Sequence, residues 1–102
     1  MNNFFVNLVV FCLAPVFISC GSGVSEKKSA GQVLYEANCA NCHGTDGKLC
    51  ALGAKDLSLS TMTKEQAAEI IANGKSTMTP FKFLLTSEEI QAVSDYVEAL
   101  KK

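Results

Sequence analysis

Residues 39–43 read Cys39-Ala40-Asn41-Cys42-His43, a C-x-x-C-H pentapeptide. Two thiols three residues apart share one helical turn, so each can add to a vinyl group of the same porphyrin. The histidine that follows points an imidazole at the iron. The spacing therefore predicts one covalent haem c, with Cys39 and Cys42 as its thioethers and His43 as the proximal iron ligand.

Three other interpretations of these cysteines stay open at this point. A redox dithiol needs a βαβ surround, and no neighbouring stretch alternates like a strand. A Cys₃His zinc site would add Cys50 to the pentapeptide, but the adjacent Cys42 and His43 would strain the backbone in turning to one tetrahedral ion. In the third interpretation the cysteines are simply buried.

Length and charge narrow the class of protein. The chain has 102 residues, enough for one domain, and its formal net charge is −1. Without a basic cluster, this charge gives no reason to expect a nucleic-acid partner.

The first twenty residues predict a targeting segment. The run from Phe4 to Ile18 is apolar apart from Asn7, and its 15 residues are fewer than the ~20 needed to cross a bilayer. Cys20 follows Ser19 and precedes Gly-Ser-Gly, which resembles a bacterial lipoprotein cleavage site. We expect residues 1–19 to be a lipoprotein-type signal peptide and Cys20 to be lipidated. Ordinary secretion and an uncleaved anchor are the alternatives.

Residues 20–28 are polar and carry no period, so they predict a flexible tether, and the domain is expected at 29–102. The protein would lie on the periplasmic side of a bacterial membrane, anchored by lipid, with a soluble periplasmic protein as the alternative. Cys12 would leave with the signal. The remaining cysteine, Cys50, receives no function and is expected to be a small buried hydrophobe.

The sequence of the domain predicts an all-α fold with three helices. The first begins at an N-cap Ser29, with Gln32 completing a capping-box pattern. Its expected apolar positions are Val33, Leu34, Tyr35 and Ala37. Gly31 costs about 1 kcal/mol against alanine inside a helix, and a close helix crossing would explain its presence.

The two later helices carry complete capping signals. Thr63 with Gln66 opens a helix that stops at Asn73-Gly74, a C-cap signature. Thr86 with Glu89 opens the last helix. Its apolar positions at helical spacing are Ile90, Val93, Val97 and Leu100, with Leu85 as the partner of Ile90 in a hydrophobic staple.

A six-coordinate haem needs a second axial ligand, and His43 is the only histidine. Because Met1 would leave with the signal, the thioethers of Met62 and Met78 remain. Met78 lies 35 residues beyond His43 in a loop that Pro80 stiffens, whereas Met62 immediately precedes a predicted helix cap. We favour Met78 as the distal ligand, with Met62 or an open site as alternatives.

With the CANCH pentapeptide, the downstream methionine and three helices, the sequence resembles a small class I monohaem cytochrome c from about Ala30 to Leu100. The resemblance implies three to four helices wrapped around one covalent haem. It also implies that the N-terminal helix, at Gly31 and Tyr35, crosses the C-terminal helix near Tyr96 and Leu100.

The same resemblance implies the roles of the site residues. Cys39 and Cys42 would form the thioethers, His43 would be the proximal ligand and Met78 the distal one. Many members have a proline before the leucine that corresponds to Leu57, and a backbone carbonyl there accepts the hydrogen bond of the proximal histidine. Lys55 takes the place of that proline, which leaves open the carbonyl that serves here.

The function hypothesis is a membrane-tethered one-electron carrier and not an enzyme. Its partners would be redox proteins of the respiratory chain, such as a quinol-oxidising complex or dehydrogenase as donor and a terminal oxidase or reductase as acceptor. Lysines expected near the haem edge, as docking groups or as scattered solubilising charges, are Lys48, Lys55, Lys75 and Lys82. A peroxidase-type enzyme with a labile Met78 and a Cys₃His zinc interaction module are the competing hypotheses.

Overall fold

The computed structural model describes residues 21, 23 and 25–102. The predicted signal peptide at 1–19 and the predicted lipidation of Cys20 therefore lie outside the described residues. Among the residues that are described, no helix is both long enough and apolar enough to span a membrane.

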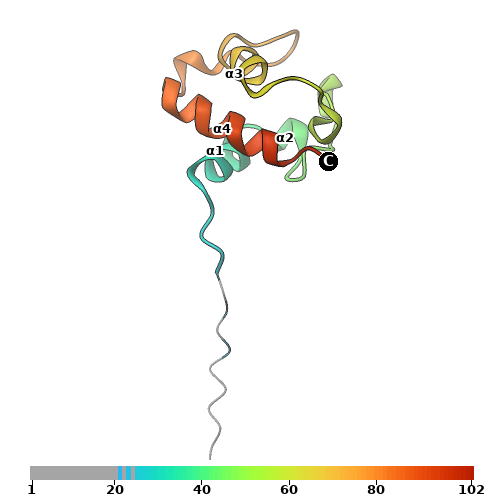
Figure 1. The fold of residues 1–102 in the computed structure, drawn as a ribbon. Helices are drawn as coiled ribbons and strands as arrows, with labels where there is room; N and C mark the ends of the chain where they lie inside the picture. Colours follow the sequence, from blue (N-terminus) through green and yellow to red (C-terminus); the bar gives the residue numbers. More distant parts are fainter. Residues whose placement is uncertain (1–20, 22, 24) are drawn as a thin grey trace, which may run out of the picture.

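The described domain is built from helices and loops, as predicted, and it contains no β-sheet (Figure 1). In chain order the elements are α1 (Ala30–Asn38), α2 (Ala40–His43), η1 (Ala51–Gly53), η2 (Leu57–Leu59), α3 (Lys64–Asn73), η3 (Phe81–Phe83) and α4 (Ser87–Ala99), where η marks a short 3₁₀ helix. The last helix, α4, packs against both α1 and α3. The long connection from α2 to α3 forms part of the wall of the site described below.

The crossing of α1 and α4 explains the glycine in the first helix. A Cβ placed on Gly31 would lie 2.0 Å from the carbonyl oxygen of Ala92 and 3.3 Å from the Cβ of Tyr96. One turn later, the rings of Tyr35 and Tyr96 pack with their centroids 5.1 Å apart at an interplanar angle of 54°. The predicted close crossing is confirmed, and a side chain larger than hydrogen does not fit there.

Two details of α1 differ from the prediction. Gly31 and Tyr35 are buried, whereas Val33 is 53% exposed and Ala37 is also exposed. Positions two residues away from the buried pair point to the opposite side of a helix, because successive residues advance by about 100°. The expectation that Val33 and Ala37 belong to the apolar, buried face of α1 was therefore wrong.

The capping box of α1 is only half formed. The Ser29 hydroxyl accepts a hydrogen bond from the Gln32 backbone N–H at 3.1 Å, as predicted. The Gln32 side-chain amide instead donates to the Glu36 carboxylate at 3.0 Å, because that carboxylate lies one turn ahead on the same face. Glu36 is also paired with Lys28 at 2.5 Å.

The caps of α3 and α4 form completely. Thr63 and Gln66 exchange both hydrogen bonds of the capping box, and so do Thr86 and Glu89. The C-cap of α3 is Gly74, with φ of 73°. The buried face of α4 consists of Ile90, Val93, Ser94 and Val97. Its three apolar residues form one core with Tyr35, Cys39, Ala68 and Ile71.

Candidate haem site

The pentapeptide lies at the junction of two helices. Cys39 is both the C-cap of α1 and the N-cap of α2, and its N–H donates to the carbonyl of Tyr35 at 2.8 Å. The His43 N–H donates back to the carbonyl of Cys39 at 3.0 Å. One helical turn therefore carries both thiols and the imidazole, as the sequence predicted.

Cys39, Cys42 and His43 line one cavity of about 540 Å³. Its walls come from the loops on either side of α3 as well as from α3 and α4. Apolar lining residues include Leu57, Ile70, Ile71, Phe81, Val93 and Val97. A mostly apolar cavity with a few placed donor atoms suits a large apolar cofactor such as a porphyrin.

The tautomer of His43 follows from its hydrogen bond. Its Nδ1 lies 3.0 Å from the backbone carbonyl oxygen of Lys55. A carbonyl only accepts, so Nδ1 carries the proton and donates it, which leaves the Nε2 lone pair available for a metal. Lys55 thus supplies the carbonyl that the sequence left open.

Tyr35 holds the backbone at Gly44, the residue that follows His43. Its hydroxyl donates to the carbonyl of Gly44 at 2.6 Å, and its side chain is fully buried. Burial raises the pKa of Tyr35 far above its usual range, so the hydroxyl stays a neutral donor. The sequence assigned this tyrosine only a packing position. The available signal for its role at the site was its position four residues before Cys39.

Gly44 itself has φ of 77°, which favours glycine. A Cβ there would lie 2.9 Å from the Cβ of Leu49, whose N–H donates to the His43 carbonyl at 2.9 Å. The chain therefore turns sharply after the histidine, and the turn is held by hydrogen bonds on both sides.

Cys39 and Cys50 have opposite surroundings. Burial raises the pKa of the Cys39 thiol to about 11, with the neighbouring Cys42 adding to the shift, so this sulfur is kept neutral in an apolar wall. Cys50 is exposed, and its Sγ lies 3.6 Å from the Lys48 carbonyl. The expected burial of Cys50 was wrong, because the loop leaves residues 48–50 on the outside of the domain.

The zinc alternative finds no support in the described part of the chain. No group of three or more His, Cys, Asp or Glu side chains lies there close enough together to hold a metal ion. Cys50, which the Cys₃His set requires, does not line the cavity that the other three residues share.

Both candidate distal ligands line the cavity. Met78 is half-buried and packs against the core, and its N–H donates to the Lys75 carbonyl at 2.9 Å. Met62 lies on the segment that precedes α3. The Met62 carbonyl accepts a hydrogen bond from Lys101. The fold thus brings together His43 and both thioethers in one cavity.

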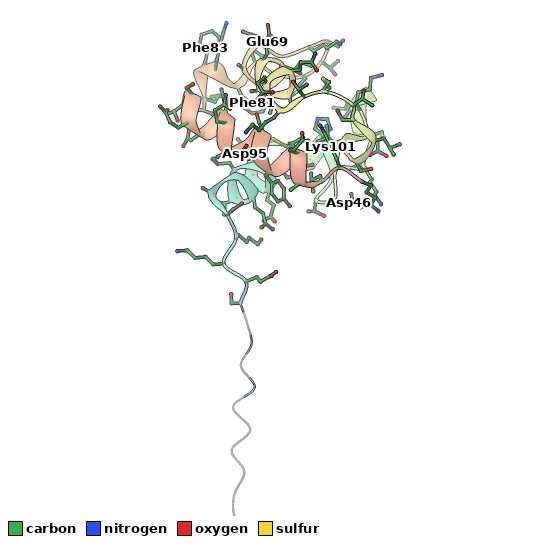
Figure 2. All side chains as sticks on the ribbon, viewed as in Figure 1. Asp46, Glu69, Phe81, Phe83, Asp95 and Lys101 are labelled. Carbon is green, nitrogen blue, oxygen red and sulfur yellow. The ribbon has the colours of Figure 1, made fainter. Side chains whose placement is uncertain are left out.

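The four lysines expected near the haem edge do not form one group. Lys55 and Lys75 line the cavity, whereas Lys48 and Lys82 do not. The Lys82 Nζ lies 3.3 Å from the Asn73 side-chain oxygen and 5.2 Å from the ring centroid of Phe83. Phe83 and Asp46, which is near Lys48, lie at opposite ends of the domain (Figure 2).

The residues fit a haem. Two cysteine sulfurs can form the thioether bonds to the porphyrin, and an imidazole with a free Nε2 and a methionine thioether can ligate the iron. These groups line a mostly apolar cavity that protein side chains leave unfilled.

Comparison with known proteins gives the same family. The family model described as "Cytochrome C oxidase, cbb3-type, subunit III" matches residues 26–97. The chain is 39% identical to cytochrome c6 of Leptolyngbya boryana over 75 residues, which are 68% of this chain and 87% of that protein.

Solved structures agree. The chain matches cytochrome c6C from Synechococcus sp. PCC 7002 with a TM-score of 0.60 and 36% identity, covering 68% of this chain and 90% of that one. It matches cytochrome c6 from the diatom Phaeodactylum tricornutum with a TM-score of 0.61 and 32% identity, covering 69% and 88%. The chain therefore belongs to the class I monohaem c-type cytochromes and carries one covalent haem c.

Proposed function

We propose that this electron carrier passes single electrons between respiratory redox proteins of a bacterial cell envelope, with its iron ligated by His43 and Met78. The observation that carries the proposal is the shared cavity, in which a histidine with a free Nε2 and the thioether of Met78 face the same space. The family model is named for an oxidase subunit, which favours a terminal oxidase as one partner class.

The ligand set explains the suitability for electron transfer. When bound, the haem supplies an iron that takes up and gives back one electron. Cys39 and Cys42 would hold the porphyrin through thioether bonds. His43, oriented by the Lys55 carbonyl, and Met78 would occupy both axial positions. A neutral thioether favours ferrous iron and raises the reduction potential.

Carbon monoxide binding tests the carrier against the peroxidase alternative. We expect the ferrous wild-type protein at neutral pH to leave carbon monoxide unbound, because Met78 would close the sixth position. The Met78→Ala protein is the matched control and should bind it. Ready binding by the wild type would favour an enzyme with an open iron site.

Membrane attachment is a separate part of the proposal and depends on Cys20. In a bacterial host that processes lipoproteins, the full chain should fractionate with membranes and its N-terminus should carry lipid by mass spectrometry. The Cys20→Ser protein should keep its pigment and lose the membrane fraction. A wild-type chain found entirely in the soluble periplasmic fraction would contradict the tether and leave the carrier function standing.

A further inference from the structure

One wall of the haem cavity has little regular structure of its own. We call it the 57–62 segment; five of its six residues line the cavity, namely Leu57, Leu59, Ser60, Thr61 and Met62. Its regular structure is the single 3₁₀ turn of η2. At its start, the Leu57 N–H donates to the Gly47 carbonyl at 2.8 Å. Residues 58–62 are joined to the rest of the fold by other hydrogen bonds.

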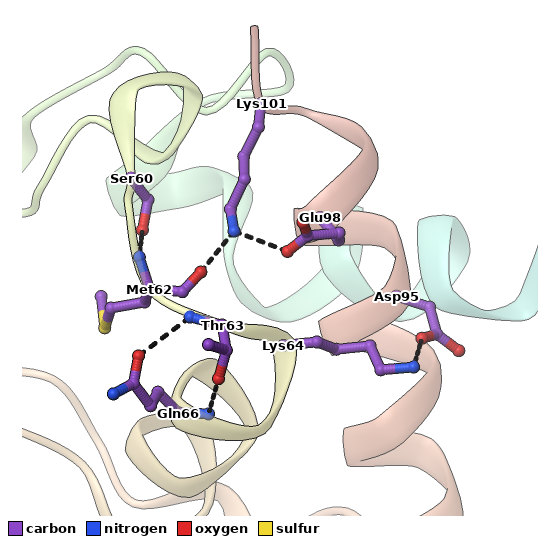
Figure 3. Close-up of polar contacts among 8 residues, drawn as sticks. All are labelled: Ser60, Met62, Thr63, Lys64, Gln66, Asp95, Glu98 and Lys101. Atoms are coloured by element: carbon purple, nitrogen blue, oxygen red, sulfur yellow. Dashed lines mark hydrogen bonds and ion pairs between the residues drawn. The ribbon is translucent and has the colours of Figure 1, made fainter.

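These bonds come from the end of the chain. Within the described residues, the hydrogen bonds that join positions 58–62 to another element are made by Lys101 and Lys102. The Lys102 N–H donates to the Ser58 carbonyl at 3.1 Å, and the Lys101 ammonium donates to the Met62 carbonyl. Lys102 and Lys101 therefore hold residues 58–62 at the first and last of these positions. Figure 3 shows the bonds of the Lys101 ammonium to Met62 and Glu98.

Lys101 is well placed to hold this wall. Its Nζ also lies 2.6 Å from the Glu98 carboxylate, on the last turn of α4. Its side chain is 19% exposed, against 41% for Lys64. Lys64 pairs at 2.8 Å with Asp95, which also lies on α4, and its ammonium makes no hydrogen bond to the 57–62 segment. A shielded ammonium with a fixed counterion gives a stronger hydrogen bond than a mobile surface lysine.

We propose that Lys101 is a positioning residue for electron transfer: held by Glu98, its ammonium binds the Met62 carbonyl and keeps the 57–62 segment closed over the haem cavity. Closure excludes water from the iron. Because ferric haem carries one more positive charge than ferrous haem, water entering the cavity stabilises the ferric state and lowers the reduction potential. The proposal rests on haem occupying this cavity.

The test uses pigmented full-length protein and three variants. Lys101→Met removes the charge and the donor at similar length, Lys101→Arg keeps both, and Lys64→Met removes the other lysine that pairs with a carboxylate of α4. Two quantities are measured: amide hydrogen exchange in peptides covering 57–62, and the ratio of ferric to ferrous protein at a fixed applied potential.

Lys101→Met should speed exchange in the 57–62 segment by tenfold or more and raise the ferric to ferrous ratio at least threefold. Lys101→Arg and Lys64→Met should stay within twofold of wild type in both measurements. Glu98→Gln, which leaves Lys101 in place, should give an intermediate change and covers the case in which Lys101→Met folds poorly.

Two results overturn the proposal. Unchanged exchange in both Lys101→Met and Glu98→Gln means that the ammonium does not hold the wall. Faster exchange with an unchanged ferric to ferrous ratio means that Lys101 is structural only. Absence of pigment in the wild type would instead overturn the proposed haem function, so the two failures are distinguishable.

Discussion

At the scale of single residues, Tyr35 links the helical core to the turn that follows His43. Its ring packs against Tyr96 while its hydroxyl binds the carbonyl of Gly44. Removing the hydroxyl takes away one of the two hydrogen bonds to that carbonyl, which also accepts from the Gly47 N–H at 3.2 Å. Tyr35→Phe should therefore lower the free energy of unfolding by about 0.5 to 1.5 kcal/mol, measured by denaturant titration.

The same residue predicts a pH dependence. Burial raises the pKa of folded Tyr35, whereas an unfolded tyrosine ionises near pH 10. The folded state thus retains this proton longer, so the contribution of Tyr35 is full below about pH 10 and is lost as the pH rises further. Melting temperatures from pH 7 to 11 should fall more steeply in wild type than in Tyr35→Phe. Parallel curves would contradict the buried, neutral hydroxyl.

A pair of substitutions decides which of the two methionines, Met62 or Met78, is the distal iron ligand. Met78→Ala should abolish the iron–thioether absorption and lower the reduction potential by on the order of 100 mV, within the roughly 0.8 V that axial ligands span. Met62→Ala, in the same cavity, should keep the absorption. If the band survives Met78→Ala and disappears in Met62→Ala, Met62 is the distal ligand.

At the scale of elements, the contact of α1 with α4 outweighs helix propensity. Alanine is favoured over glycine in a helix by about 1 kcal/mol, but a Cβ at position 31 would lie 2.0 Å from the Ala92 carbonyl oxygen. Gly31→Ala should therefore destabilise the protein by about 1 to 3 kcal/mol, as overpacking does. Thermal unfolding checks this, with the exposed Val33→Ala as the near-neutral control. A stabilised Gly31→Ala protein would contradict the close crossing.

The helices were predicted well because the capping signals that start and end them involve residues close in sequence. The caps at Thr63 and Thr86 and the C-cap at Gly74 each depend on residues within one turn. The half-formed box of Ser29 and Gln32 is a local error, because Glu36 takes the Gln32 side chain. The other errors arise where a residue distant in sequence decides. The burial of α1 is set by where α4 crosses it, so Val33 is exposed despite its apolar side chain.

The site divides in the same way. The pentapeptide alone predicts the attachment residues, because the spacing of its two thiols is what a covalent haem requires. The Lys55 carbonyl, the Tyr35 hydroxyl and the Lys101 ammonium each act across 9 to 39 residues of sequence, and such pairings follow only from the folded chain. The exposure of Cys50 likewise depends on the path of its loop.

At the scale of the whole molecule, a haem in the cavity would complete the core. A domain this small buries little apolar surface, and its cavity of about 540 Å³ borders the buried residues Tyr35, Ile71, Val93 and Val97. The protein without haem should lose cooperative folding. Circular dichroism of the Cys39→Ser/Cys42→Ser protein should show less helix and no sharp melting transition, whereas Cys50→Ser should resemble wild type.

The account depends above all on haem joined to the chain through Cys39 and Cys42. The most direct measurement is a haem-stained denaturing gel of protein made in a host equipped for cytochrome maturation. We predict a stained band at the mass of the polypeptide for wild type and Cys50→Ser, and none for the Cys39→Ser/Cys42→Ser protein. A colourless wild-type band, or a metal that dissociates on denaturation, would contradict the account.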